Sequence, residues 1–155
     1  MFRSHVFRGT KFPHSLCRAG KEGFGVSTTE RAGIRIQVTS LERTLVDVLD
    51  RPGLSGIWEE ILRSLESIEF FDLDKVVEYA ILLRYATTGA KVGFFLEQHR
   101  ELLMVDDRHL KPLHDIRPLQ PHYLDRAKRK SGRLVSEWNL VVPGEVSERM
   151  WGEVL

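Results

Sequence analysis

The class of the fold is decided by Val38-Thr39-Ser40-Leu41-Glu42-Arg43-Thr44-Leu45-Val46-Asp47-Val48-Leu49-Asp50-Arg51-Pro52, which contains a whole helix with signals for both ends. Thr39 and Glu42 have the spacing of a capping box, in which each side chain satisfies a backbone donor near the other. Arg51 places positive charge at the C-terminal end of the helix, and Pro52 stops its continuation. The apolar residues recur at the spacing of one helical face: Leu41, Leu45, Val48 and Leu49.

Further helices are predicted downstream, each with a polar residue that can cap its start. Ser55 precedes a segment whose apolar face comprises Trp58, Ile61, Leu62 and Leu65. Asp72 precedes a second, with Leu73, Val76, Val77, Ala80 and Ile81 facing inward. Thr87–Thr88 introduces a third, with Val92, Phe95, Leu96, His99 and Leu103 on one side. One more short turn is predicted to begin at 105–107 and to be limited by Pro112.

Strand patterns lie on both sides of the helices. Segments 2–8, 23–28 and 34–39 are rich in aromatic and β-branched residues, and in the last of them apolar Ile34, Ile36 and Val38 alternate with polar residues. A similar alternation over 134–142 ends at Pro143–Gly144, and 145–155 has the pattern of an amphipathic helix. The sequence therefore predicts one α+β domain over 1–155, with a small, mostly antiparallel sheet packed against a bundle of four to five helices.

The composition is that of a soluble globular protein, and we expect the protein to reside in the cytoplasm. Hydrophobic residues make up 42% and charged residues 29% of the 155, and the net charge of +1 gives no global signature of nucleic-acid binding. A single cysteine, Cys17, excludes a disulfide framework within the chain. The sequence contains no apolar run long enough for a transmembrane helix and no secretory signal at its start.

The run 38–52, followed by Leu54-Ser55-Gly56-Ile57-Trp58-Glu59-Glu60, resembles the C-terminal domain of the AbiEi family. Segments 79–86 and 91–97 also fit that pattern, and the resemblance extends from about Arg8 to Val142. It differs at Ile57, where family members usually have the second glycine of a Gly-Gly pair. AbiEi proteins are antitoxins and transcriptional regulators of type IV toxin–antitoxin and phage-defence systems.

The resemblance implies a neighbouring nucleotidyltransferase-type toxin that the protein counteracts, usually without a stable complex, and possible autoregulation of the operon. Family members normally carry an N-terminal winged-helix DNA-binding domain, which we expect to be absent here. Because Phe2 already lies in a predicted strand, we expect the chain to be the later part of a longer protein or a shortened version.

The sharpest charge cluster is a nucleic-acid-binding candidate, which we call the basic segment: Arg126, Lys128, Arg129, Lys130 and Arg133. Five cations between two predicted strands can bind phosphates through charge and counterion release. A solvated hairpin loop has the same composition, so both interpretations remain open. Tyr123 and Trp138 flank the segment and can stack on bases, although Trp138 lies on an apolar face and we favour a core role for it.

The other candidate sites are weaker. His109 and His114 are five residues apart, which does not align them on a helix, so we predict neither a metal site nor a cofactor. The acidic pairs Glu42 with Asp47, and Asp72 with Asp74, leave open a small metal-dependent enzyme acting on nucleic acid or nucleotides. A truncated remnant without function is the other alternative. Adjacent Phe94 and Phe95 predict either a partly exposed interface or a fully buried helix.

Overall fold

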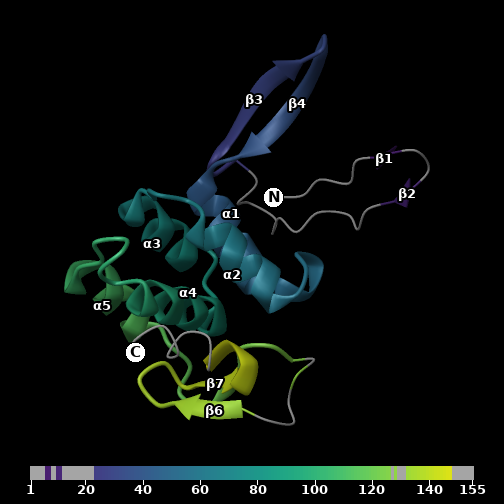
Figure 1. The fold of residues 1–155 in the computed structure, drawn as a ribbon. Helices are drawn as coiled ribbons and strands as arrows, with labels where there is room; N and C mark the ends of the chain where they lie inside the picture. The colour runs from purple at the N-terminus through teal and green to yellow at the C-terminus, as the bar shows by residue number, and fades with distance from the viewer. Residues whose placement is uncertain (1–5, 8–9, 12–22, 127, 129–131, 148–155) are drawn as a thin grey trace.

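The computed structural model describes residues 6–7, 10–11, 23–126, 128 and 132–147. The helices are α1 (Leu41–Asp50), the 3₁₀ helix η1 (Pro52–Leu54), α2 (Trp58–Glu66), α3 (Leu73–Leu82), α4 (Ala86–Gln98) and α5 (Asp107–Asp115). The strands are β1 (Val6–Phe7), β2 (Thr10–Lys11), β3 (Val26–Arg31), β4 (Ile34–Thr39), β5 (His122–Tyr123), β6 (Gly132–Val135) and β7 (Leu140–Pro143). The predicted α+β class is confirmed. The strands form three small sheets in place of one: β1–β2, β3–β4 and β5–β7–β6 (Figure 1).

Helix α4 is the centre of the helical bundle. It packs against α1, α3 and α5, and every residue from Thr88 to Leu96 is buried. Phe94 and Phe95 are 3% and 2% exposed, so the fully buried alternative is correct and the partly exposed interface is wrong. A helix that is apolar all round is stable only where neighbours cover each face. Here the bundle covers one side and the β5–β7–β6 sheet covers the other (Figure 1).

The start of α1 differs from the predicted capping box. The Ser40 hydroxyl, and not that of Thr39, accepts the hydrogen bond from the Arg43 backbone at 3.3 Å. Thr39 ends β4 and bonds the hydroxyl of Thr44 at 2.8 Å. The Glu42 carboxylate accepts from the backbone of Asp72 at 3.1 Å, which joins α1 to the start of α3. Glu42 is therefore used for a contact between helices, which local spacing cannot reveal.

The ends of the other helices agree in part with the predictions. Asp72 caps α3 as predicted, by accepting from the Lys75 backbone at 3.2 Å. Ser55 does not cap α2, which begins at Trp58 after the N-cap residue Ile57; it ends η1 instead. Helix α4 begins at Ala86, before the predicted threonines. Pro112 lies inside α5 and does not end it.

Three predicted inward-facing residues are exposed at helix surfaces or on the hairpin. Ile81 is 38% and Leu41 is 50% exposed, and Ile34 in the β3–β4 hairpin is 65% exposed. The hairpin pairs in antiparallel register from Val26↔Thr39 to Arg31↔Ile34 and projects away from the bundle (Figure 1). The predicted half-buried face of β4 is therefore wrong, because no other element covers it among the described residues.

The base of the hairpin is attached to the bundle by a buried network. The Arg43 guanidinium donates to the carbonyl of Phe24 and to the Asp47 carboxylate, which also accepts from the Tyr79 hydroxyl at 2.9 Å. The Phe24 ring stacks on the Tyr79 ring at 4.9 Å between centroids. Because Arg43 and Asp47 are 0% and 5% exposed, the network is an ion pair inside the core and joins α1, α3 and the hairpin.

The predicted strand over 134–142 is a hairpin. Strands β6 and β7 pair antiparallel around a turn at 136–139, and β5 adds to β7 in parallel. The turn carries Trp138, which is 1% exposed, and its ring lies directly on α4 at Gly93. The indole nitrogen donates to Glu97 at 2.7 Å. The predicted core role of Trp138 is thus confirmed. Strand β7 ends at Pro143. Of the helix predicted at 145–155, residues 145–147 are helical, and the rest lies outside the described residues.

Candidate functional site

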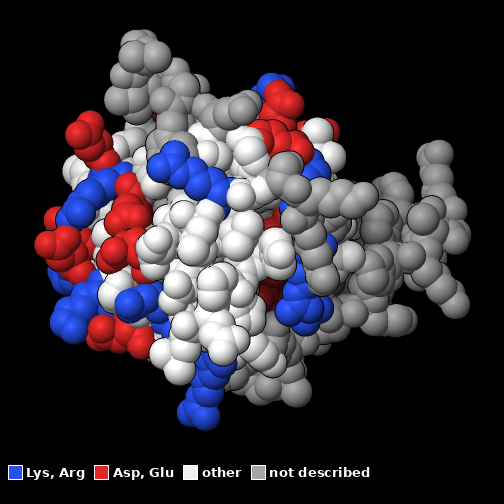
Figure 2. Space-filling view, turned by 90° about the horizontal axis from the view of Figure 1, so that it is seen from below, with Lys and Arg blue, Asp and Glu red and all other residues white. Residues whose placement is uncertain are grey.

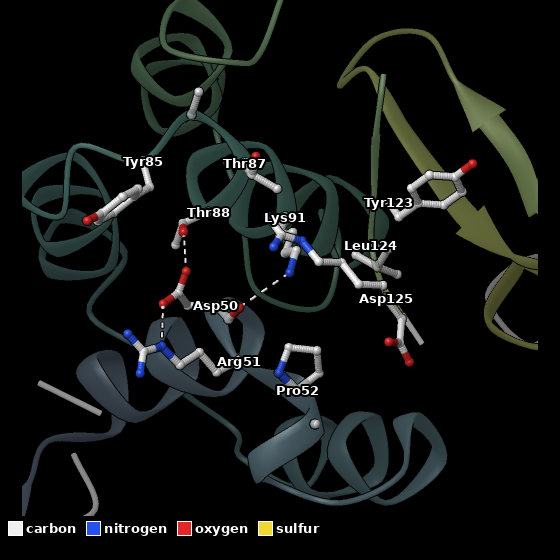
Figure 3. Close-up of a pocket in the computed structure, with 13 residues that line it drawn as sticks. Asp50, Arg51, Pro52, Tyr85, Thr87, Thr88, Lys91, Tyr123, Leu124 and Asp125 are labelled. Atoms are coloured by element: carbon white, nitrogen blue, oxygen red, sulfur yellow. Dashed lines mark hydrogen bonds and ion pairs between the residues drawn. The ribbon is translucent and has the colours of Figure 1, made fainter. Parts of the chain in front are cut away.

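A cavity of about 530 Å³ opens where three segments distant in sequence meet: 50–53, 85–91 and 123–126 (Figure 3). The first segment contains the end of α1 and the start of η1, the second contains the N-cap and N-terminal half of α4, and the third begins at the end of β5. Its volume lies within the range of small-molecule sites, about 300–1,000 Å³. We call it the α1–α4 pocket.

Hydrogen bonds hold the walls of the α1–α4 pocket together. The Asp50 carboxylate accepts from the Thr88 hydroxyl and lies 3.5 Å from Nε of Arg51 (Figure 3). On the opposite wall the Asp125 carboxylate accepts from the indole nitrogen of Trp58 at 3.1 Å. Both acidic groups that line the pocket are therefore engaged by residues of the wall.

Lys91 is the most unusual residue of the pocket. The residue is 7% exposed, although lysine is almost never fully buried unless it is paired. Its ammonium donates to the backbone carbonyl of Asp50 at 3.4 Å, at the negative end of the α1 dipole (Figure 3). Burial lowers the pKa of Lys91, and the positive charge of Arg126 acts in the same direction, while Asp50 and Asp125 oppose them.

The N-terminus of α4 also faces the pocket. The first amides of a helix have no acceptor within the helix, and the N-cap residue Tyr85 supplies no side-chain hydrogen bond to them. Thr87 and Thr88 lie in this first turn and both line the pocket. The Thr87 hydroxyl is 3.2 Å from Nδ1 of His122, which positions β5 beside the helix.

The structure separates the members of the basic segment. Arg126 lines the α1–α4 pocket, whereas Lys128 forms an ion pair with Glu145 at 2.7 Å. Arg133 lies on β6, opposite Val142 of β7. Arg129 and Lys130 lie outside the described residues. Figure 2 shows the face seen from below, where the blue side chains stand apart among uncharged and acidic ones. The described residues on this face therefore form no continuous basic patch.

The histidines considered as metal ligands have separate partners. His99 bonds the carbonyl of Phe95 at 2.8 Å and Glu66 at 3.2 Å, as predicted for a hydrogen-bonded side chain. The His109 ring accepts from the Asp106 backbone at 3.0 Å, and His114 lies 3.0 Å from Glu137. Within the described part of the chain, no three or more His, Cys, Asp or Glu side chains are grouped to hold a metal ion.

Three of the four acidic residues of the enzyme alternative are engaged in the fold. Glu42 bonds the backbone of Asp72, and Asp47 belongs to the buried network with Arg43 and Tyr79. Asp72 caps α3, and hydrogen bonds from Lys75 hold the pKa of that carboxyl below its usual value of 3.8. These contacts give the three carboxylates structural roles.

Sequence reasoning missed Lys91 and Thr88. The signal was present: in the sequence of α4, Ala86–Gln98, Lys91 is the only cation and lies among apolar and small residues. A charged residue on a buried helical face needs a polar partner or a cavity.

No protein-family model, curated protein or solved structure matches this chain. Over the described residues, none of the helices combines the length and apolar character needed to span a membrane.

Proposed function

We propose that the protein is an antitoxin-type regulator of a type IV toxin–antitoxin system that counteracts a nucleotidyltransferase-like toxin. One observation carries the proposal beyond the resemblance to AbiEi proteins. The sequence segments of that resemblance, 38–52, 79–86 and 91–97, contribute Asp50, Arg51, Tyr85 and Lys91 to one pocket. Segments that resemble a family because they share its function should meet at one site in the fold. These three segments do meet, at the α1–α4 pocket.

The protein acts by binding in this proposal, and the basic segment supplies a nucleic-acid contact. Arg126 is exposed at the α1–α4 pocket, and Lys128 and Arg133 are exposed beside it in the sequence. Contacts of this kind bind the phosphate backbone without reading bases, so affinity falls as salt rises. Such contacts can assist autoregulation of the operon when a winged-helix domain recognises the base sequence of the operator.

Growth rescue tests the antitoxin role. Cells that express the toxin encoded beside this gene should resume growth when the chain accumulates in soluble form. Continued arrest with a soluble, folded chain would contradict the proposal for this polypeptide.

The nucleic-acid contact is tested separately by a variant in which all five cations of the basic segment are replaced by Gln. Its affinity for duplex DNA should fall and the slope of log affinity against log salt should become shallower. The matched control replaces five exposed cations outside the basic segment: Arg63, Lys75, Arg100, Arg108 and Lys111. If the two variants bind alike, the basic segment has no role in binding.

A further inference from the structure

We propose that the α1–α4 pocket is a phosphate-binding site, which takes the phosphate group of a nucleotide or of a similar phosphorylated small molecule. This assignment goes beyond the antitoxin role and does not depend on it. It follows from three features of the pocket: a buried ammonium, an uncapped helix N-terminus, and cations with an aromatic ring at the rim.

The buried ammonium comes first. An ammonium has three N–H donors, and among the described residues Lys91 meets one acceptor, the carbonyl of Asp50 at 3.4 Å. The nearby Asp50 carboxylate accepts from the Thr88 hydroxyl and lies 3.5 Å from Nε of Arg51, and its negative charge attracts Lys91. A phosphate oxygen in the pocket would supply both negative charge and the missing acceptors.

The helix terminus adds a second set of donors at the same place. Helix α4 has 13 residues, and its N-terminus carries partial positive charge together with amides that lack intrahelical acceptors. The side chain of Tyr85 does not cap them. Thr87, whose hydroxyl lies 3.2 Å from Nδ1 of His122, adds a hydroxyl group in the first turn, whereas the hydroxyl of Thr88 already donates to Asp50. Backbone amides, hydroxyls and a lysine at a helix N-terminus are the groups that proteins use to bind phosphate.

The rim fits the remainder of such a ligand. Arg51 and Arg126 line the pocket from two different segments of the chain, so that polyphosphate charge can be balanced beyond the first phosphate. Tyr85 lines the pocket and is 45% exposed, which leaves its ring accessible for stacking on a base. The volume of about 530 Å³ is much larger than one phosphate requires.

The acidic side chains of the wall do not cancel this charge. Asp50 and Asp125 face Lys91, Arg51 and Arg126, so the five ionised groups that line the pocket sum to +1. Each carboxylate also accepts a hydrogen bond from the wall, from Thr88 and Trp58 respectively. In the alternative, structural role, Lys91 only caps the C-terminus of α1 through the Asp50 carbonyl. The experiment must separate this role from phosphate binding.

Isothermal titration with pyrophosphate, ATP and adenosine is the direct test. Wild-type protein should bind pyrophosphate and ATP but not adenosine. Lys91→Met should weaken pyrophosphate binding by at least about tenfold, the loss typical of a hydrogen bond to a charged group. Arg51→Gln changes an accessible side chain and should also weaken binding, which keeps the test valid if Lys91→Met fails to fold. Lys75→Met, an exposed cation on α3, is the matched control.

A comparison of oligonucleotides with ATP identifies the source of the phosphate, and two outcomes would overturn the proposed phosphate site. An oligonucleotide with a 5′-phosphate that binds more tightly than both ATP and its unphosphorylated form would identify a nucleic-acid end as the source, whereas tighter ATP binding would identify a free nucleotide. Absence of binding by all phosphorylated probes at millimolar concentration would overturn the proposal. So would unchanged affinity in both Lys91→Met and Arg51→Gln. These binding measurements are independent of toxin rescue, and because Arg126 belongs to both the pocket and the basic segment, they use Lys91 and Arg51, which lie outside the basic segment.

Discussion

Among the described glycines, Gly93 is the one where an added methyl group would meet the closest contacts. A Cβ built there would lie 2.2 Å from two ring carbons of Trp138. Carbon atoms in good contact are about 3.5 Å apart or more, so the ring would have to retreat by about 1.3 Å. Trp138 has no room to do so at low cost, because it is 1% exposed and its indole nitrogen is held by Glu97 at 2.7 Å.

The change in the free energy of unfolding follows from one favourable term and two unfavourable ones. Alanine in place of glycine inside a helix stabilises it by about 1 kcal/mol. Overpacking a core costs about 1–3 kcal/mol, and losing the bond between Trp138 and the charged Glu97 costs about 1.5–3 kcal/mol more. Together these terms predict that Gly93→Ala lowers the free energy of unfolding by about 1.5–5 kcal/mol. For a chain of 155 residues, at about 2–4 °C per kcal/mol, this corresponds to a Tm lowered by about 3–20 °C.

Thermal and urea unfolding, followed by far-UV circular dichroism, would measure this loss. Gly89→Ala is the matched control in the same helix, with the same gain in helix propensity. Its Cβ would meet the Cδ1 of Ile116 at 2.7 Å, which is the mobile end of a flexible side chain. Gly89→Ala should therefore be clearly less damaging. A Gly93→Ala protein as stable as wild type would refute the seating of Trp138 on α4.

Three other substitutions test the charged groups of the structure. Asp47→Asn should lower the free energy of unfolding in urea by about 3–5 kcal/mol, because it leaves the buried Arg43 without its ion-pair partner. Burial lowers the pKa of Lys91 in the folded protein. The free energy of unfolding should therefore rise as pH increases from the folded pKa of Lys91 to its unfolded value of 10.5. Lys91→Met should abolish that rise when melting is measured as a function of pH. Hydrogen bonds from Lys75 lower the pKa of Asp72, so its contribution is complete above pH 3.8 and disappears as pH falls through the folded value. Asp72→Asn should remove this part of the acid transition.

The helices could be predicted from the sequence because their signals are local. Pro52 ends the first helix region and Asp72 caps α3, and both need only neighbouring residues to act. The choice of Ser40 over Thr39 as the first cap could not be predicted in this way. Thr39 pairs with Val26 in the hairpin, and that pairing depends on a distant segment.

The strands were harder to predict because alternation does not report burial or turns. Ile34 and Val38 alternate with polar residues, yet both are exposed because the hairpin projects from the bundle. In 134–142 a single alternating pattern contains two strands and a turn. The turn is required by the fit of Trp138 onto Gly93, a contact between residues 45 positions apart that periodicity cannot reveal.

The α1–α4 pocket illustrates the same limit at the level of function. Its lysine, its threonines and its arginines lie on three segments, and no single segment has a recognisable ligand-binding motif. The sequence does contain one signal: Lys91 is the only cation in the mostly apolar and small residues of α4. In the structure, every position from Thr88 to Leu96 is buried. A buried ammonium is costly to the folded protein, and burial dominates the shift in its pKa. Replacement by methionine would remove that cost, so Lys91→Met separates the two roles of this lysine: a phosphate-binding lysine loses affinity for pyrophosphate, and a lysine that only caps α1 does not.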